Sequence, residues 1–301
     1  MSRLIQFKWI YLEKTVDFLN DIQGMPGQFS QENFIDWVSV PGNNPLKNIL
    51  LLENFENGKL EGVIFIWPEL NIRRTVVEVK TSADNISQFN IKNFLKLESM
   101  FSDIYSKCDY IHVPLDENFI SSFVEFEKIG FNHIKTYAEM ELSDFSFINS
   151  TITDGYLFKN YIDGDEKELT VVQNESFKGS WGFSPNSVEQ VYYKVNSNIY
   201  SGKGVIFLVK DNTIIGYVWT YVRETKAGLI GIIGMIGVLS AYRNNQFGKI
   251  ILERAINQLL EQGVKNVRLE VDLANLQAVR LYSKLGFRQT RKIYWHEKSL
   301  T

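Results

Sequence analysis

The segment from Leu269 to Phe287 constrains the fold of this chain more than any other part of the sequence. A strand, a short loop, a helix and a glycine-led entry into a new strand are predicted within it. Asn275, Ala278 and Tyr282 stand at helical spacings of zero, three and seven, so they share one helix face. A small residue between an amide and a phenol suits a narrow ligand that lies along that face.

This segment resembles the C-terminal motif of the GCN5-related N-acetyltransferase (GNAT) superfamily, whose members are acyl-CoA-dependent acyltransferases. The pattern Asn-x-x-Ala-x-x-x-Tyr-x-Lys-x-Gly-Phe is matched in full, and the preceding Leu-Glu-Val is shared with the ribosomal-protein N-terminal acetyltransferases. The plainer alternative is an amphipathic helix packed on a strand, with Tyr282 as a core aromatic. The number of agreeing positions favours the functional interpretation.

A second motif, from Val238 to Lys249, links an apolar strand to an amphipathic helix. The N-terminus of a helix has unpaired N–H groups and a partial positive charge, which suit a pyrophosphate. The motif resembles the superfamily's pyrophosphate loop, Arg/Gln-x-x-Gly-x-Gly/Ala, and Arg243 and Gly248 match its ends. Gln246 replaces the middle glycine. Gln246 can still donate its backbone N–H if its φ is negative, so the departure affects cofactor affinity rather than the site itself.

The resemblance implies that acetyl-CoA binds in the C-terminal half as a co-substrate. In the superfamily, the strand before the loop splays from its neighbour, and its free backbone groups pair with the pantetheine arm. The cofactor-binding residues implied in this way are Ile236, Gly237, Val238, Arg243, Asn244, Asn245, Gln246, Phe247, Gly248, Lys249, Asn275, Ala278 and Tyr282. For residues 236–238 an ordinary core strand is the alternative.

Acyl transfer from a thioester to an amine requires the amine to lose a proton and the departing thiolate to gain one. The motif match assigns the acid role to Tyr282, because a phenol with a pKa of about 10 can protonate a leaving thiolate. Glu270 is the candidate base, since the matching Glu has that role in the resembling N-terminal acetyltransferases and burial would raise its pKa. The alternative for Glu270 is a structural ion pair with Arg268 or Lys265. The further candidates for the base are Asp272, Glu224 and Glu175.

Acceptor contacts are expected from the glycine-punctuated loop 177–185, where Trp181 and Phe183 either wall a pocket or anchor the loop. The three histidines are scattered without metal-ligand spacing, so we expect no metal. The resemblance implies a primary amine of a small molecule or a peptide N-terminus as the acceptor. The identity of the acceptor, the preferred acyl chain and the oligomeric state do not follow from the sequence.

The chain is predicted to be a tandem repeat. Lys128–Phe131 resembles Lys284–Phe287 at an offset of 156 residues, and at that offset residues 109–113 fall on 265–269. Two segments that each predict a hairpin, 49–67 and 205–219, also echo one another. We therefore expect an α/β fold with two tandem GNAT-like domains, each a twisted mixed sheet flanked by helices. The domains would span residues 1–145 and 155–301, joined by a polar linker near 143–154.

The second half gives a clear order of elements. Strands are expected at about 156–162, 204–210, 213–224, 228–238 and 265–271, with a strand pair from 287 to 298, and helices at about 165–177, 186–195, 246–262 and 275–284. The first half suggests a similar order from Leu4 to Leu142, with a helix at 90–107.

The first half appears as a degenerate copy in this comparison. At the same offset, Pro114, Phe119 and Phe126 stand in place of the candidate base, amide and acid, and no Arg-x-x-Gly-x-Gly precedes the helix at 90–107. We expect this half to keep the fold without the chemistry. The arrangement resembles tandem acetyltransferases of the mycothiol synthase type, in which only the C-terminal copy is catalytic. That likeness is architectural and does not transfer the substrate.

Composition excludes several classes of partner. The net charge is −3 and there is no long basic run, so nucleic acid and anionic membranes are not expected partners. Cys108 is the single cysteine, which excludes an intrachain disulfide. The longest apolar stretch, Gly228–Leu239, is shorter than the roughly 20 residues that span a bilayer. No targeting segment is recognisable, so a cytoplasmic location is the default expectation.

The leading hypothesis is an acetyl-CoA-dependent N-acetyltransferase. The main alternative is a non-catalytic acyl-CoA-binding or regulatory module, suggested by Gln246 and the degenerate first half. An aminoacyl transferase that uses tRNA is a third possibility, because that class also duplicates this fold. The acidic balance and the intact cofactor motif argue against it.

Overall fold

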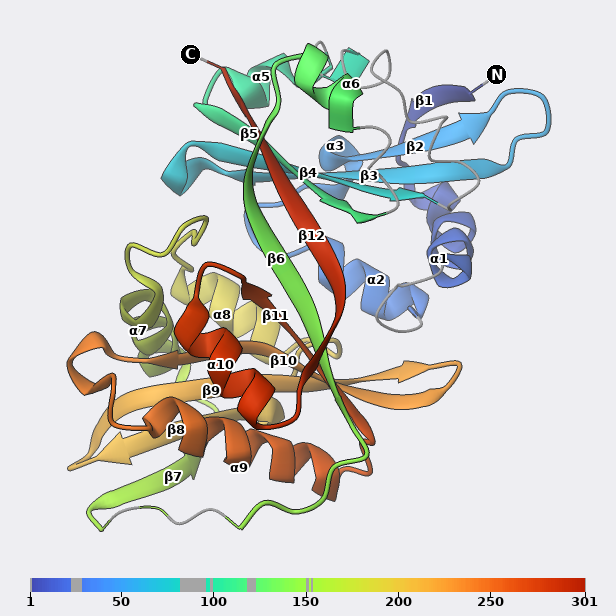
Figure 1. The fold of residues 1–301 in the computed structure, drawn as a ribbon. Coiled ribbons are helices and arrows are strands. Elements are labelled where there is room, and N and C mark those ends of the chain that lie inside the picture. Colours follow the sequence, from blue (N-terminus) through green and yellow to red (C-terminus); the bar gives the residue numbers. More distant parts are fainter. Residues whose placement is uncertain are drawn as a thin grey trace.

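The computed structural model describes residues 2–22, 29–81, 96–97, 100–117, 123–149, 152 and 154–300. These residues form one twelve-stranded mixed sheet flanked by helices (Figure 1). The strands are β1 (Ser2–Gln6), β2 (Ile49–Asn54), β3 (Leu60–Glu69), β4 (Arg74–Thr81), β5 (Tyr110–Asp116), β6 (Asn132–Ser143), β7 (Tyr156–Asn160), β8 (Val205–Lys210), β9 (Thr213–Thr225), β10 (Gly228–Val238), β11 (Asn266–Asp272) and β12 (Arg288–Ser299). The α-helices are α1 (Leu12–Asp21), α2 (Gln31–Val38), α3 (Pro45–Asn48), α5 (Ser102–Tyr105), α6 (Phe123–Lys128), α7 (Glu166–Phe177), α8 (Val188–Val195), α9 (Phe247–Glu261) and α10 (Leu276–Lys284).

The internal repeat is visible in the strand bounds. β2 and β8, β5 and β11, and β6 and β12 each begin and end 156 residues apart. The parallel pairing of β4 with β5, at 74–76 and 110–112, recurs between β10 and β11 at 230–232 and 266–268. The predicted match of residues 109–113 with 265–269 and both predicted hairpins are confirmed, since β2–β3 and β8–β9 pair antiparallel. Of the helix expected at 90–107, the described residues contain α5, and residues 90–95 and 98–99 lie outside them.

The two halves exchange their last strands. β12 pairs with β5 of the first half, β6 pairs with β11 of the second half, and β6 and β12 pair with each other, all antiparallel. Figure 1 shows these two long strands running together between the upper and lower parts of the molecule. The strand pair expected at 287–298 is therefore wrong. The segment is one continuous strand, because its hydrogen-bond partners are β5 and β6 rather than a hairpin mate.

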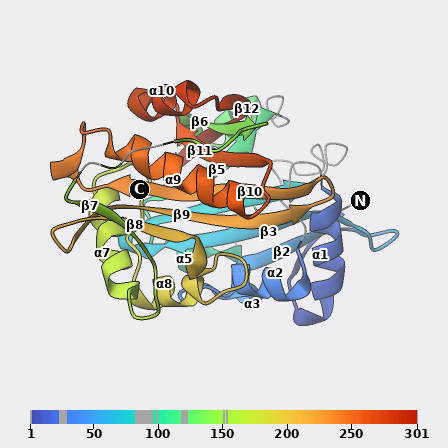
Figure 2. The same cartoon turned by 90° about the horizontal axis from the view of Figure 1, so that it is seen from below.

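Helices cover both faces of the sheet in the second half. Figure 2 shows α9 and α10 on one side of the strands and α7 and α8 on the other. Ile251, Leu252 and Ile256 of α9 are buried in one core cluster with Ile215 and Val218 of β9 and Ile233 of β10. Leu169 of α7 and Val191 of α8 are buried against the opposite face. Because strand side chains alternate, each residue of these strands is assigned to one of the two faces.

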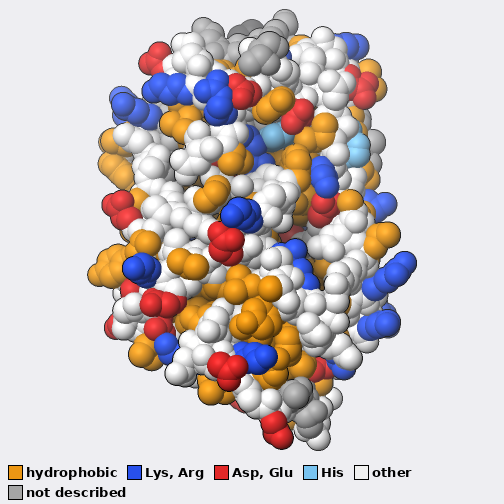
Figure 3. Space-filling view, turned by 90° about the vertical axis from the view of Figure 1, so that its left-hand side faces the viewer, with side chains coloured by type: hydrophobic (Ala, Val, Ile, Leu, Met, Phe, Trp, Pro, Cys, Tyr) orange, Lys and Arg blue, Asp and Glu red, His pale blue; other side chains and the backbone are white. Residues whose placement is uncertain are grey.

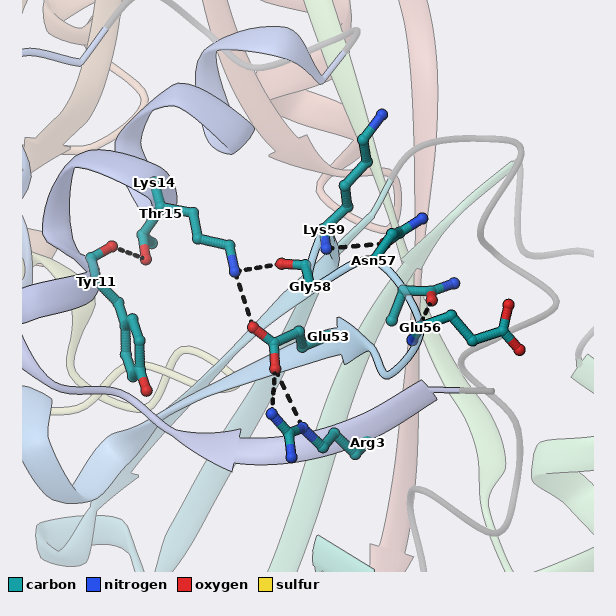
Figure 4. A network of polar contacts seen from close by, with 10 residues as sticks. Arg3, Tyr11, Lys14, Thr15, Glu53, Glu56, Asn57, Gly58 and Lys59 are labelled. Atoms are coloured by element: carbon teal, nitrogen blue, oxygen red, sulfur yellow. Dashed lines mark hydrogen bonds and ion pairs between the residues drawn. The ribbon is translucent and has the colours of Figure 1, made fainter.

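A buried carboxylate ties together the outer elements of the first half (Figure 4). Glu53 of β2 accepts two hydrogen bonds from Arg3 of β1, at 3.1 and 2.8 Å, and one from Lys14 of α1 at 2.8 Å. Lys14 also donates to the carbonyl of Gly58 in the β2–β3 turn. The hydrogen bonds from Lys14 and Arg3 hold the pKa of Glu53 below its usual value. The edge of the sheet is thus closed by a satisfied network of hydrogen bonds.

Direct contacts also cross between the halves away from the exchanged strands. Arg74 of β4 donates to the carbonyl of Gly182 at 2.6 Å. Gln190 of α8 donates to the carbonyl of Pro41 at 3.0 Å. Among the described residues, no helix is both long and apolar enough to cross a membrane.

The exchange of β6 and β12 predicts that the halves do not fold independently. Residues 1–145 alone leave β5 without β12, and residues 155–301 alone leave β11 without β6. We expect each fragment to show no cooperative thermal unfolding by circular dichroism. The full chain, cut by a protease site placed in segment 145–154, should retain both fragments in one folded particle. A cooperative transition for 155–301 alone would contradict this prediction.

Candidate active site

The edge of β10 that faces β11 is unpaired over the last part of β10, where the family resemblance implied a splay. Parallel pairing of the two strands stops at Ile232 and Arg268, while β10 continues along β9 to Val238 through a bulge between Ile233 and Met235. Beyond Ile232, the other edge of β10 therefore has no strand partner among the described residues. This free edge includes the backbone of Ile236, Gly237 and Val238, the three positions expected to face a pantetheine arm.

Glycine at position 237 permits close packing of α7 on this strand. A Cβ there would lie 2.7 Å from Cβ of Ser176 and 2.9 Å from the ring of Tyr217. Such distances require the neighbours to move, so Gly237 brings the C-terminal end of α7 directly against the splayed edge.

The loop before α9 presents a run of free backbone donors. Within the described part of the chain, the N–H groups of residues 244–248 donate no hydrogen bond, while those of Lys249 and Ile250 donate to the carbonyl of Gln246. The five donors stand at the positive end of a fifteen-residue helix. Such a concavity of successive N–H groups suits an anion.

The negative φ that the sequence analysis set as a condition for Gln246 is not found. Its φ is +62°, and that of Asn244 is +66°, so both residues adopt the left-handed conformation. Gln246 takes a backbone geometry that glycine adopts at little cost, because the loop must turn sharply into α9. The substitution changes the side chain and adds strain without removing the turn.

Most side chains of this loop make contacts within the protein. Arg243 donates to the carbonyls of Ser176 and Val238, at 2.6 and 3.1 Å, and so joins α7 to the end of β10. The ring of Phe247 is buried in the core, 4.8 Å from the ring of Tyr156. The side chain of Phe247 therefore belongs to the core, and at this loop only its backbone N–H is free to contact a ligand.

The remaining predicted loop residues behave in the same way. The Asn245 side chain donates to the carbonyls of Tyr242 and Arg243. Lys249 lies 3.5 Å from Glu253 one turn further along α9. Gly248 has open space around it, since a Cβ there would meet only a side-chain carbon of Leu281 at 3.9 Å. An anion at this loop is thus met chiefly by backbone donors.

The two sequence motifs are joined by a hydrogen bond. Gln277 of α10 donates to the side-chain oxygen of Asn244 at 3.1 Å. Asn275 stands one residue before α10 as its N-cap, and its side-chain oxygen accepts from the N–H of Ala278 at 3.2 Å. Its oxygen is therefore used to cap the helix, which leaves the amide nitrogen for a ligand.

Tyr282 lies in the core beneath α9 but keeps an open hydroxyl. Its side chain is 7% exposed and its ring packs 5.9 Å from that of Phe287. Among the described residues nothing hydrogen-bonds the hydroxyl, which is not sealed from solvent. Burial raises the pKa of Tyr282 to about 12, so the phenol holds its proton at neutral pH.

Glu270 points to the face opposite α9. Val267, Leu269 and Val271 on the same strand are buried in the core on the α9 side, so Glu270 lies on the side of α7 and α8. Its carboxylate is reached by solvent, and yet desolvation raises its pKa. Figure 3 shows charged side chains of both signs at mid-height on one side of the molecule, where the halves meet.

The ion-pair alternative for Glu270 is wrong for the described residues. Arg268 instead bonds Glu141 at 2.6 Å, and no cation lies within ion-pair distance of Glu270. The more distant Arg291 lowers the pKa of Glu270, and the carboxylate of Glu139 raises it. The reserve candidate Asp272 is less suitable as a base.

The carboxylate of Asp272 is already paired with neighbouring groups. Its carboxylate pairs with Lys135 of β6 at 2.6 Å and also accepts from the N–H of Ala274 at 2.9 Å. The other two reserves, Glu175 and Glu224, are exposed. Of the carboxylates that the sequence singled out, Glu270 alone combines a raised pKa with the absence of an ion pair in the described structure.

Trp181 is anchored on the first half. Its ring lies 5.2 Å from that of His112 and 5.5 Å from that of Trp295, and the guanidinium of Arg74 lies 5.7 Å from its centre. Phe183 stacks on Phe177 at 5.3 Å within its own loop. These contacts fix the loop over the sheet face that carries Glu270. A substrate contact by either residue stays a prediction.

The sequence analysis did not single out Tyr221 and Arg223. Both lie on β9 and share the Glu270 face with Tyr217 and Trp219. A Cβ on Gly234 would meet the Tyr221 ring at 2.7 Å, so this ring lies over the β10 bulge. Burial raises the pKa of Tyr221, Arg223 lowers it, and Glu270 raises it. The alternation of aromatic residues along β9 was the available signal.

Comparisons with known proteins agree with this geometry. Residues 167–287 match the sequence model described as the acetyltransferase (GNAT) family. A mycothiol acetyltransferase of Stackebrandtia nassauensis is 27% identical over 153 residues, which is 48% of each chain. The chain thus matches about half the length of this curated relative.

Two solved structures share the whole fold. A GCN5-related N-acetyltransferase from Sphaerobacter thermophilus has a TM-score of 0.74 at 17% identity and covers 99% of this chain and 95% of its own. A tandem GNAT protein from the clavulanic acid biosynthesis pathway has a TM-score of 0.70 at 10% identity, covering 99% and 98%. At these identities the likeness shows the fold, which is that of a tandem GNAT protein.

The left-handed backbone at Gln246 predicts that Gln246→Gly stabilises the protein. Glycine removes a conformational cost of about 1 kcal/mol, so we expect a higher Tm together with unchanged or tighter binding of CoA. Thermal unfolding and calorimetric titration with CoA measure the two effects. Gln262→Gly, at the other end of α9 where φ is −85°, is the matched control and should gain nothing. Loss of CoA binding in Gln246→Gly would contradict the role assigned to this loop.

The raised pKa of Glu270 predicts that Glu270→Gln raises the Tm at pH 7. A carboxyl whose folded pKa exceeds its unfolded value stabilises most at low pH, and this contribution is lost as the pH rises through the folded pKa. The gain should therefore shrink as the pH falls through the raised pKa of the folded state, and it should be absent below about 4.5, where a glutamate is protonated in the folded and the unfolded state alike. Glu141→Gln, which breaks the pair with Arg268, should instead lower the Tm. A lower Tm for Glu270→Gln at pH 7 would indicate an ion pair.

Proposed function

We propose that this chain, whose residues 167–287 form a domain of the acetyltransferase (GNAT) family, transfers an acetyl group from acetyl-CoA to a primary amine of a small molecule or a peptide. The chemistry is assigned to the second half. The observation that carries this proposal is the run of five free N–H groups at residues 244–248, next to the unpaired edge of β10. The first half has Pro114, paired with Trp295 in the sheet, at the position of Glu270.

The residues present fit the co-substrate. The N–H groups of 244–248 would hold the pyrophosphate at the positive end of α9. The free edge of β10, at Ile236–Val238, would pair with the amides of the pantetheine arm. Acetyl-CoA supplies the acetyl group as a thioester, and in the overall reaction the acceptor nitrogen gains the acetyl carbon while the carbon–sulfur bond breaks.

Two side chains move protons in this proposal. An alkyl ammonium has a pKa of about 10.4, so an acceptor reaches the site protonated and must lose a proton to react. Glu270 takes that proton, because its raised pKa makes it a stronger base than an ordinary glutamate and no ion pair holds it. The protonated hydroxyl of Tyr282 returns a proton to the departing sulfur.

One of the two reasons for the alternative, a non-catalytic acyl-CoA-binding module, is weakened by the structure. It was suggested by the missing glycine at position 246, and Gln246 takes the left-handed backbone that a glycine would take. The loop therefore keeps its donors free. Acetyl transfer is the function that this arrangement supports best.

Tyr282→Phe tests the acid role. We expect kcat for CoA release to fall by about 100-fold or more, while the Kd for acetyl-CoA changes little because the ring and its packing remain. Release of free thiol and calorimetric titration measure the two quantities. Tyr156→Phe, which alters another ring of the same core, is the control and should keep its turnover. Unchanged turnover in Tyr282→Phe removes this residue from the mechanism, and absence of CoA binding by the unaltered protein overturns the proposed function.

A further inference from the structure

We infer that the acceptor carries an anionic group, a carboxylate or a phosphate, in addition to its amine, and that Arg223 binds this anion while Glu270 faces the amine. The inference deepens the proposed function and rests on it. It starts from the charges that remain unpaired on one face of the sheet.

The charged groups that act on Glu270 are already matched with one another. Arg291 of β12 pairs with Glu139 of β6 at 3.0 Å, and Lys80 of β4 pairs with Glu78 at 3.2 Å. Glu270 is left without an ion pair among the described residues. Arg291 is also shared with Asp116 at 3.7 Å, so negative charges outnumber positive ones around Glu270, which suits the ammonium group of an incoming amine.

Arg223 is the corresponding cation: its side chain hydrogen-bonds Tyr221 but has no acidic partner among the described residues. Its guanidinium lies 5.1 Å from the centre of the Tyr221 ring and 6.0 Å from that of Phe29, and in the described residues no carboxylate pairs with it. Its Nε is buried and has no hydrogen-bond partner. Aromatic walls favour a cation but do not supply its counter-charge. A partly buried guanidinium without an anion is costly, so a ligand that brings one is stabilised.

Strand register places the two charges on one face and within reach of one ligand. Arg223 is paired with Ile230 of β10, which is paired with Asn266 of β11, and Glu270 follows four residues along that strand. About 4.8 Å between strands and about 3.3 Å per residue put the two Cα atoms on the order of 15 Å apart. The long arginine side chain shortens this gap, and Tyr221, two residues before Arg223 on β9, lies on the same face of the sheet.

This anion site is separate from the loop at residues 244–248. The loop follows Val238, at the end of β10, whereas Arg223 stands beside Ile230 near the start of that strand. A guanidinium presents two parallel donors that match the oxygens of a carboxylate or a phosphate. An acceptor that bears both an amine and such a group satisfies Glu270 and Arg223 together. A simple amine leaves Arg223 unpaired.

Matched pairs of amines test the inference. The pairs are ε-aminocaproate with its methyl ester and glucosamine phosphate with glucosamine, so that each pair keeps the amine and removes the anion. Two measurements are made: CoA release from acetyl-CoA, and equilibrium binding of each amine in the presence of CoA. We expect the anionic member of at least one pair to bind about tenfold more tightly or better, because a hydrogen-bonded ion pair is added. The pair that shows the preference distinguishes a carboxylate from a phosphate.

Variants localise the effect. Arg223→Gln should remove the preference for the anionic member and leave binding of its neutral counterpart and of CoA unchanged, whereas Arg223→Lys should restore part of the preference. Arg288→Gln, an exposed arginine of β12, is the control and should keep the preference. Equal binding of both members of both pairs by the unaltered protein overturns the inference, as does an equal loss of both members in Arg223→Gln. Absence of CoA release with every amine overturns the proposed function instead, and the binding measurement still decides the inference.

Discussion

The pairing of β6 with β12 is the constraint on which the rest of the structure depends. Each half ends in a strand that hydrogen-bonds to the other half, so two repeats form one continuous sheet. The candidate site lies beside this junction. Glu139 of β6, Arg291 of β12 and Glu270 of β11 stand on neighbouring strands there. The first half therefore supplies charges to a site whose donor loop and hydroxyl belong to the second half.

The groups assigned to function share one property. In the described structure the N–H groups at 244–248 donate no hydrogen bond, the hydroxyl of Tyr282 has no hydrogen-bond partner, the carboxylate of Glu270 has no ion pair, and the Nε of Arg223 is buried without a partner. Charged neighbours such as Arg268 and Asp272 are paired. Unpaired polar groups within a protein reduce its stability, and a ligand that pairs with them offsets that cost.

Local patterns predicted the elements well and the contacts poorly. Bounds of the helices at 166–177 and 247–261 lie within about one residue of expectation, because hydrophobic period and capping residues act over short distances. The conformation of Gln246 was missed, since propensity disfavours a left-handed glutamine and the turn into α9 overrides it. The ion pair suggested for Glu270 is also absent, because Arg268, the nearest cation in the sequence, pairs instead with Glu141 of β6, which is distant in sequence.

The sequence by itself determined the repeat, the strand that leads into a loop at the start of a helix, and the motif residues from Asn275 to Tyr282, because each is written in residue types along the chain, whereas the splay of that strand was implied only by the family resemblance. Only the tertiary structure decided that the last strands are exchanged, that Glu270 is free, and that Arg223 and Tyr221 share its face. Those features depend on which strands become neighbours, and strand order is set by pairing across more than 100 residues of chain, which no local pattern encodes.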